Sequence, residues 1–313
     1  MIGMKSISIV VPVFNEEENI KRLHDEILGA CQKLGTDFEI IFVDDGSRDK
    51  TAEIAKTLSP LTLIRMRKNF GQTAAMDAGI KAATQDYIIT MDGDCQNDPA
   101  DIPRMIEALE TSGADVVSGW RKNRKDTFMK RFVSRGANML RSILVKDDIH
   151  DSGCSLKIYR RECFDGVNLY GEMHRFIPAL LKIRGFKIDE LVVNHRPRTA
   201  GITKYNWKRT IKGLLDMVAL WFWKKYAVRP LHMLGGVALM LMGLGFLALL
   251  AGGILMCFKL LWGGYFFFGT LLFWVMGAQC IIFGLLADMI SKNTYDNSER
   301  TYYNVKETIT NHE

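Results

Sequence analysis

The sequence has no Gly-x-Gly-x-x-Gly run after its first apolar strand pattern and no Gly-x4-Gly-Lys-Ser/Thr run anywhere in its 313 residues. These absences disfavour a dinucleotide dehydrogenase and a P-loop NTPase. Its six cysteines form no Cys-x-x-Cys pair, and its six histidines show no zinc-like spacing. Free thiols in a reducing compartment are therefore expected. The N-terminus also lacks a signal-peptide cleavage site, because acidic residues follow its short apolar run.

One part of the chain is almost without charge. Residues 230–287 contain one charged side chain, Lys259, in 58 positions. Two apolar runs, at about 231–257 and 265–287, each exceed the ~20 residues that cross a bilayer core. A buried helical hairpin in a soluble core is the alternative interpretation. The length of both runs favours a pair of transmembrane helices.

Basic residues flank the first of these runs. Lys224, Lys225 and Arg229 precede it, whereas the turn between the runs has only Lys259. The positive-inside bias predicts that residues 1–229 lie in the cytosol, and two spans return the tail to the same side. The expected organisation is a catalytic domain, juxtamembrane amphipathic helices, two transmembrane helices and a cytosolic tail, at residues 1–206, 207–229, 230–287 and 288–313.

Acidic and basic residues are distributed unevenly along the chain. Residues 1–115 have 12 basic and 20 acidic residues, a net charge of −8, whereas residues 116–229 have 25 basic and 10 acidic residues, a net charge of +15. The remainder contributes −1, which gives +6 overall. A strongly basic region before a membrane segment indicates contact with phosphates or anionic headgroups. Nucleic-acid binding is disfavoured because no nucleic-acid motif occurs.

The acidic part alternates strand and helix patterns, which predicts a doubly wound, mostly parallel α/β sheet. Its apolar runs are rich in β-branched residues, as in strands buried on both faces. The expected strands are Ser6–Phe14, Phe38–Val43, Leu61–Met66, Tyr87–Met91 and Ala114–Ser118. Helical patterns separate them at Glu16–Leu34, Asp49–Leu58, Gln72–Ala83 and Ile102–Leu109. Such sheets bind ligands at the carboxyl ends of their strands.

Polar residues gather at three of these strand ends. The segments are PVFNE at 12–16, VDDGS at 43–47 and MDGDCQ at 91–96. In the third, two carboxylates at i and i+2 and an amide two residues later supply the oxygen ligands that Mg²⁺ or Mn²⁺ prefers. A lone Asp-x-Asp is weak evidence, because solvated turns often contain it. Its place after an apolar strand, beside a second acidic turn, favours a functional site.

Several motifs in series resemble the family 2 glycosyltransferases of the GT-A fold. They are PVFNEEENI, VDDGSRDKT, NFGQTAAMDAG and MDGDCQNDP. The later motifs DSGCSLKIYRRE, HRFIPALL and RPRTAGITKYNWKR, followed by two spans, are similar to those of polyprenyl-phosphate glycosyltransferases. That group contains dolichyl-phosphate mannose synthase and bacterial undecaprenyl-phosphate sugar transferases. The resemblance covers about residues 1–290.

The resemblance implies roles for individual residues. The positions that match the nucleotide-sugar site are Pro12, Asn15, Glu16, Asp44, Asp45, Gly71, Asp77 and Asp92. Those that match the metal and diphosphate cluster are Asp92, Asp94 and Gln96, with Asp94 as the direct metal ligand. Those that match the acceptor-phosphate site are Arg121, Lys157, Arg198, Thr203, Lys204 and Tyr205. The expected catalytic set is Asp94, Asp151, Arg198 and Lys204. Lys157 and Thr203 stand where Arg and Ser are common in the family.

The implied reaction is an inverting single displacement. The donor is a nucleoside diphosphate sugar, with UDP favoured over GDP, and the acceptor is undecaprenyl phosphate or another polyprenyl phosphate. Asp151 matches an acidic position near the reaction centre. It is expected to orient the acceptor or to act as a weak base, with a turn cap before Ser152 as the alternative. Mg²⁺ or Mn²⁺ is the expected cofactor.

Two basic amphipathic patterns, at 126–144 and 207–226, predict helices that lie in the membrane interface on anionic lipids. Helices packed on the domain are the alternative. The resemblance also implies a homo-oligomer, such as a tetramer, in the bacterial inner membrane. Three further hypotheses remain open: another lipid acceptor, a processive polysaccharide synthase, and a non-catalytic nucleotide-sugar-binding membrane protein. The absent Gln-x-x-Arg-Trp motif and the intact acidic cluster disfavour the last two. The sequence does not identify the sugar.

Overall fold

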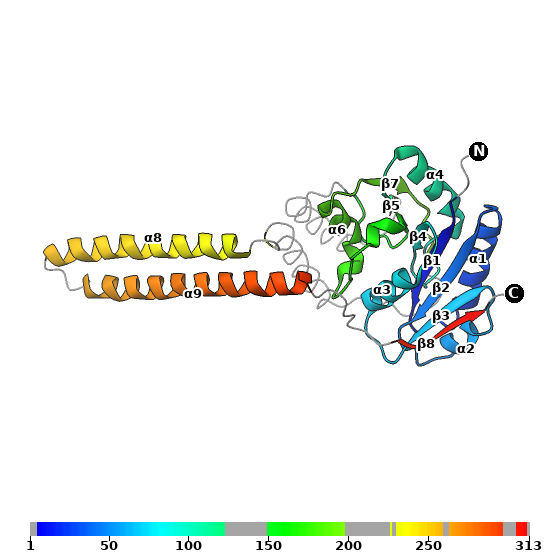
Figure 1. The fold of residues 1–313 in the computed structure, drawn as a ribbon, viewed down its shortest axis with the longest axis horizontal. Helices are drawn as coiled ribbons and strands as arrows, with labels where there is room; N and C mark the ends of the chain where they lie inside the picture. The colour runs from blue at the N-terminus through cyan, green and yellow to red at the C-terminus, as the bar shows by residue number, and fades with distance from the viewer. Residues whose placement is uncertain are drawn as a thin grey trace. The chain divides into compact units, whose positions relative to one another are not determined.

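The computed structural model describes residues 5–122, 149–197, 226, 230–258, 263–296 and 305–311. The chain divides into two units, Met1–Val218 with Thr301–Glu313, and Ala219–Arg300. The first unit contains a mixed α/β sheet, and the second contains two long apolar helices (Figure 1).

Within the described residues, the first unit has an eight-stranded sheet in the order β7-β5-β6-β4-β1-β2-β3-β8. The strands are β1 (Ile7–Val13), β2 (Phe38–Asp44), β3 (Leu61–Met66), β4 (Tyr87–Thr90), β5 (Val116–Trp120), β6 (Lys157–Arg160), β7 (Ile188–Val192) and β8 (Val305–Asn311). Only β6 and β8 run antiparallel to their neighbours in this sheet. The mostly parallel sheet is confirmed, as are the five strands that the sequence predicts. The sequence predicts none of β6, β7 and β8.

The sheet carries helices on both faces. They are α1 (Ile20–Gln32), α2 (Thr51–Ala55), α3 (Gln72–Ala82), α4 (Ile102–Ser112) and α6 (Ile177–Ile183), with short 3-10 turns η1 (Pro99–Asp101), η2 (Arg161–Phe164) and η3 (Met173–Arg175). One core joins alternate residues of β1, such as Ile9 and Val11, to α1, α2 and α4. A second core joins Val10 to α3 and α6. All seven residues of β1 are buried, so its continuous apolar run reflects burial on both faces.

Helix α3 approaches the sheet closely at Gly79. A Cβ atom at this position would lie 2.4 Å from Val10 Cγ1 and 3.0 Å from Val43 Cγ2. Both valines are buried side chains of the central strands. The glycine therefore sets the distance between α3 and the sheet, and α3 begins beside the strand ends that carry the acidic turns.

We expect Gly79→Ala to lower the free energy of unfolding by about 1–3 kcal/mol, because overpacking forces buried side chains off their rotamers. Gly29→Ala in α1 is the matched control, since its Cβ would meet no atom of the described chain within 4 Å beyond its own helix turn. There the gain in helix propensity raises stability by up to ~1 kcal/mol. Thermal unfolding of both variants in detergent measures the difference. Equal melting temperatures would contradict the close packing of α3.

The second unit consists of α8 (Pro230–Cys257) and α9 (Gly263–Asp296), which pack side by side and antiparallel (Figure 1). Small residues let the two helices approach, since a Cβ on Gly245 would meet Trp274 at 2.5 Å and one on Gly277 would meet Met242 at 2.9 Å. Trp274 Nε1 also donates to the Met242 carbonyl at 3.2 Å. This pattern is typical of helix pairs in lipid.

Both helices are long and apolar enough to cross a membrane, with 28 and 27 residues in the candidate spans. Only 17% of each apolar window is buried, and large side chains such as Leu239, Phe268 and Met289 are exposed. A buried hairpin of a soluble core would cover these side chains, so the exposure favours lipid contact.

The chain returns to the first unit after α9. Strand β8 pairs antiparallel with β3, from Leu61 opposite Asn311 to Met66 opposite Val305. The sequence predicts only a tail for residues 288–313. The structure extends α9 to Asp296 and adds an edge strand to the sheet.

Candidate active site

Backbone and side-chain hydrogen bonds tie the loop after β1 to the loop after β2. Asn15 has a positive φ of 54°, and its N–H donates to Ser47 Oγ at 2.9 Å. Asn15 Oδ1 accepts from the N–H of Arg48 at 2.9 Å, and the N–H of Glu16 donates to Thr51 Oγ1 at 2.8 Å. The structure thus brings the PVFNE and VDDGS segments together, as the parallel sheet predicts.

Asp44 closes the turn at the end of β2. Its Oδ1 accepts from the N–H of Ser47 at 2.9 Å, and its Oδ2 lies 3.6 Å from Arg65 Nε. Pro12 lies opposite Val43 in the adjoining strand, one residue before this turn. Asp44 is only 1% exposed, so its carboxylate is held in one place at the carboxyl edge of the sheet.

Asp45 anchors the loop that precedes α3. Its two oxygens accept the N–H groups of Phe70 and Gly71 at 2.7 and 2.9 Å. Burial raises the pKa of Asp45, although these two bonds oppose the shift. Gly46 has a φ of 73°, and a Cβ there would lie 2.6 Å from the carbonyl carbon of Lys68. The Asp-Asp-Gly turn therefore needs glycine, and it brings Asp45 and Gly71 together as expected.

Helix α3 contributes one residue that sequence reasoning missed. Gln72 Nε2 donates to Asp92 Oδ1 at 2.7 Å, which links the start of α3 to the end of β4. Asp77 lies further along α3 and is 2% exposed. It accepts from the N–H of Leu169 at 2.9 Å and from Lys81 Nζ at 2.8 Å. In this structure Asp77 holds a loop of the protein against α3.

The Asp92–Gln96 loop follows β4 directly. The N–H of Asp92 donates to Asn97 Oδ1 at 3.0 Å, and the N–H of Gln96 donates to Asp94 Oδ1 at 3.2 Å. Cys95 has a φ of 58°, which turns the chain back sharply between the two. Burial, and then the negative charge of Asp94, raise the pKa of Asp92. Two carboxylates close enough to repel each other favour a bound cation.

The described residues contain no cluster of three or more His, Cys, Asp or Glu side chains that could hold a metal ion. Asp92 and Asp94 together fit a divalent cation whose remaining ligands come from a substrate and water. That arrangement suits Mg²⁺, which usually binds through one or two carboxylates and substrate phosphates.

A buried ion pair lies close enough to Asp92 for its arginine to act on that carboxylate. Arg121, which follows β5, donates through Nε and Nη2 to the two oxygens of Asp151 at 2.7 and 2.9 Å. The side chains are 11% and 17% exposed. Although burial opposes the shift, hydrogen bonds and charge from Arg121 lower the pKa of Asp151. A carboxylate held ionised in this way is a weak proton acceptor and a good orienting group.

Lys157, the first residue of β6, lies beside that pair. It is 2% exposed, and its ammonium group donates to the carbonyls of Ser152 and Cys154. Burial lowers the pKa of Lys157, while the charges of Asp151 and Asp92 oppose the shift. The lysine therefore stabilises the 151–154 turn through these two hydrogen bonds. It also adds positive charge near the carboxylates of Asp92, Asp94 and Asp151.

A second residue that sequence reasoning missed supports the same turn. Glu190 of β7 accepts the N–H of His150 at 2.9 Å and that of Asp151 at 3.4 Å. The His150 ring stacks on Trp120 with centroids 4.4 Å apart. No local pattern could have indicated this, because Glu190 lies in a half-exposed strand about forty residues away.

Comparison with known proteins identifies the family. The model for "Glycosyl transferase family 2" matches residues 8–167. A dodecaprenyl-phosphate galacturonate synthase of Rhizobium johnstonii is 39% identical over 315 residues, covering 96% of this chain and 92% of that protein. The chain belongs to the family 2 glycosyltransferases. An undecaprenyl-phosphate 4-deoxy-4-formamido-L-arabinose transferase of Pectobacterium atrosepticum is 34% identical, covering 98% and 94%. Within the family, the chain falls in the polyprenyl-phosphate sugar transferase group.

Solved structures confirm the GT-A fold of this glycosyltransferase. Glucosyl-3-phosphoglycerate synthase from Mycobacterium tuberculosis, in complex with Mn²⁺ and UDP-glucose, has a TM-score of 0.53 at 19% identity, covering 70% of this chain and 79% of that one. Mannosyl-3-phosphoglycerate synthase from Rubrobacter xylanophilus has a TM-score of 0.57 at 16% identity, covering 70% and 74%.

Some expected parts of the glycosyltransferase lie outside the described residues. They are the acceptor-phosphate residues Arg198, Thr203, Lys204 and Tyr205, and most of the amphipathic patterns at 126–144 and 207–226. The residues placed together are those expected for the nucleotide-sugar and metal sites, and the Arg121–Asp151 pair.

The lowered pKa of Asp151 makes the stability of the enzyme depend on pH in a defined direction. The ionised carboxylate stabilises the fold above the unfolded-state pKa of about 4, and this contribution is lost as the pH falls toward the lower folded-state value. We therefore expect the Asp151→Asn variant to have a lower melting temperature than wild type at pH 7. Its melting temperature should also fall less than that of wild type between pH 5 and 3. The exposed Asp37→Asn variant is the control and keeps the wild-type slope.

Proposed function

We propose that this glycosyltransferase moves a sugar from a nucleoside diphosphate sugar, with UDP favoured, to a polyprenyl phosphate such as undecaprenyl phosphate. The observation that carries the proposal is that acidic and basic side chains lie close together at one edge of the sheet. The charges of Arg121 and Lys157 reach Asp92, which also lies beside Asp94. A donor diphosphate with a cation and an acceptor phosphate need these two environments side by side.

The donor side consists of the segments after β1, β2 and β4. Asp44 and Asp45, with Pro12, Asn15, Glu16, Gly71 and Asp77, are proposed to shape the nucleotide pocket. Asp92, Asp94 and Gln96 are proposed to hold Mg²⁺ or Mn²⁺, which as a Lewis acid stabilises charge on the departing diphosphate. Gln72 fixes the orientation of the Asp92 carboxylate through its 2.7 Å hydrogen bond.

The acceptor side needs cations more than it needs a base. A phosphate monoester is already largely ionised at neutral pH, because its second pKa is near ~6. The nucleophile is thus formed in solution, and the protein has to hold it and reduce its repulsion from the donor diphosphate. Lys157 and Arg121 contribute charge to this region, and Arg198, Thr203, Lys204 and Tyr205 are proposed to contact the phosphate. The reaction is a single displacement with inversion.

Asp151 is proposed to orient the site and not to act as the base. Its two oxygens are held by Arg121, and the N–H of Arg121 also donates to it at 3.3 Å. The pair fixes the same 151–154 turn whose carbonyls accept hydrogen bonds from Lys157. This favours the orienting role among the interpretations left open by the sequence.

The membrane arrangement is proposed to place the catalytic unit and both termini in the cytosol at the bacterial inner membrane. The pairing of β8 with β3 supports this, since the segment after α9 returns to the sheet that contains β1. With α8 and α9 as spans, the chain crosses the membrane twice between β1 and β8, so both strands lie on the same side. The boundaries at residues 206, 229 and 287, and assembly as a homo-oligomer, stay predictions.

The test incubates the purified full-length enzyme with Mg²⁺ or Mn²⁺, undecaprenyl phosphate and one nucleotide sugar at a time. Because two relatives carry galacturonate and 4-deoxy-4-formamido-L-arabinose in their names, the panel contains UDP-linked forms of both, with UDP-glucose and GDP-mannose. We expect one lipid-linked monosaccharide, detected by mass spectrometry, and loss of product with EDTA. Transfer to diacylglycerol, a polymeric product, or nucleotide binding without any transfer would each contradict the proposal.

A further inference from the structure

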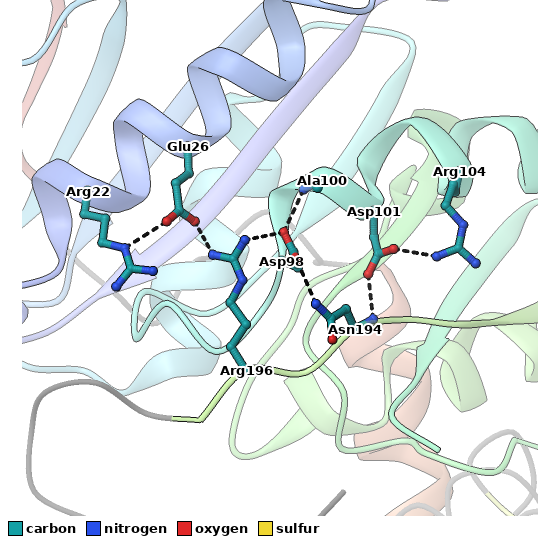
Figure 2. Close-up of polar contacts among 8 residues, drawn as sticks. All are labelled: Arg22, Glu26, Asp98, Ala100, Asp101, Arg104, Asn194 and Arg196. Carbon is teal, nitrogen blue, oxygen red and sulfur yellow. Dashed lines mark hydrogen bonds and ion pairs between the residues drawn. The ribbon is translucent and has the colours of Figure 1, made fainter. Parts of the chain in front are cut away.

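Arg196, in the segment after β7, connects three parts of the catalytic unit that are far apart in the sequence. Its Nη1 contacts Glu26 of α1, and its Nη2 lies 2.6 Å from Asp98 Oδ1 (Figure 2). The partners are 170 and 98 residues away along the chain. One planar guanidinium therefore bridges α1 and the loop that follows the Asp92–Gln96 segment.

The backbone of Arg196 contacts the Asp92–Gln96 loop directly. Its N–H donates to the Gln96 carbonyl at 2.9 Å, and the preceding residue, His195, forms a bridge with Asn97. Asn97 Oδ1 accepts from the N–H of Asp92 at 3.0 Å and from Ser155 Oγ at 2.9 Å. Backbone and side-chain contacts thus lead from the Arg196 segment through Asn97 to the backbone of Asp92, the first acidic residue of the proposed cation site.

Asp98 is the centre of this arrangement. Its Oδ2 accepts from Asn194 Nδ2 at 2.8 Å, and its Oδ1 also accepts the N–H of Ala100 at 3.1 Å. The backbone N–H of Asn194 donates to Asp101 Oδ2 at 2.6 Å (Figure 2). Asp98 and Asp101 are 8% and 5% exposed. Residues 194–196 are therefore held at three successive positions to residues 96–101, which contain the end of the Asp92–Gln96 loop and the residues that follow it.

We propose that Arg196 is a positioning residue for the donor site: the Glu26–Arg196–Asp98 bridge holds the Asp92–Gln96 loop in the geometry that binds the cation and donor diphosphate. The inference rests on the proposed function. Arginine is required because its fork spans two carboxylates, whereas lysine is a point charge.

The test measures binding, not transfer. The full-length enzyme in detergent is titrated by calorimetry with UDP, and separately with GDP, in the presence of Mn²⁺. We expect Arg196→Gln to weaken binding of the nucleotide by about tenfold or more, since the bridge between the half-buried Glu26 and the buried Asp98 is lost. Arg196→Lys keeps the charge but not the fork, and we expect it to recover only part of the affinity. Should the Gln variant not fold, the Lys variant gives the same comparison.

Arg22→Gln is the matched control. Arg22 donates to the other oxygen of Glu26 at 2.8 Å, is 48% exposed, and forms no hydrogen bond or ion pair with residues 92–97 in the described part of the chain. We expect its nucleotide affinity to equal that of wild type. Hydrogen exchange adds a measurement that needs no ligand. The backbone amides of residues 92–97 should exchange faster in Arg196→Gln than in wild type, and at the wild-type rate in Arg22→Gln.

The outcomes separate this inference from the proposed function. If Arg196→Gln lowers the melting temperature but binds nucleotide and protects residues 92–97 like wild type, Arg196 is structural only and the inference is wrong. If wild type itself binds neither UDP nor GDP with Mn²⁺, the proposed function fails, and the donor-site role of Arg196 fails with it.

Discussion

We expect Asp94→Asn to abolish sugar transfer, while expression and membrane insertion stay at the wild-type level. Asp94 is 9% exposed and accepts the N–H of Gln96, a bond that an amide oxygen can also accept, so the loop keeps its shape. The lost negative charge removes the direct ligand of the proposed cation. A cation at a departing diphosphate is worth several kcal/mol, so we expect a loss of at least about 10³-fold in kcat/KM.

The measurement is transfer of radiolabelled sugar to undecaprenyl phosphate at a Mn²⁺ concentration that just saturates the wild-type enzyme, and then at higher concentrations. Asp37→Asn, an exposed acid before β2, is the control and should retain full activity. Turnover of Asp94→Asn within tenfold of wild type would falsify the assignment of Asp94 as a metal ligand. A loss of activity that high Mn²⁺ restores would still support it, because weakened cation binding is then the cause.

The second large effect is expected at the Arg121–Asp151 pair. Arg121→Met leaves the Asp151 carboxylate buried without its bidentate partner, which typically costs about 3–5 kcal/mol. The free energy of unfolding should fall by this amount in denaturant titrations, and transfer should be lost with it. The exposed pair of Lys21 and Asp25, at 3.0 Å with 69% and 54% exposure, is the control. Lys21→Met should change stability by less than ~0.5 kcal/mol.

A double variant separates the structural role of the pair from its role in transfer. Arg121→Met with Asp151→Leu replaces both charges by apolar groups, which is often neutral or stabilising. We expect it to recover most of the stability and none of the activity. Wild-type transfer by the double variant would show that the pair serves the fold alone.

The strands of the central sheet follow from local sequence. Ile7–Val13 is rich in β-branched residues, five of its seven, and the structure buries all seven between two helix layers. The same reasoning places the acidic turns after β2 and β4 at one edge, because parallel strands end on the same side. Their hydrogen-bond partners, such as Gln72 for Asp92, could not be predicted, because they depend on how α3 approaches the sheet.

Strands β6 and β8 show the limit of this reasoning. β6 has four residues and inserts antiparallel between β4 and β5. β8 lies beyond the apolar helices and pairs with β3 across separations of 239 to 250 positions. Strand pairing at such separations is decided by packing and loop closure, and no periodicity in a short segment records its partner.

The sequence alone was sufficient for the family, the GT-A sheet, two apolar helices, and the acidic and basic division with net charges of −8 and +15. These follow from composition and from motifs within short segments. The tertiary structure decided how the basic residues are used. Arg121 is paired with Asp151, Lys157 is buried against backbone carbonyls, and Arg196 bridges Glu26 and Asp98. The physical reason is that the strength of an ion pair depends on distance and burial, and both are set by contacts between segments far apart in the chain.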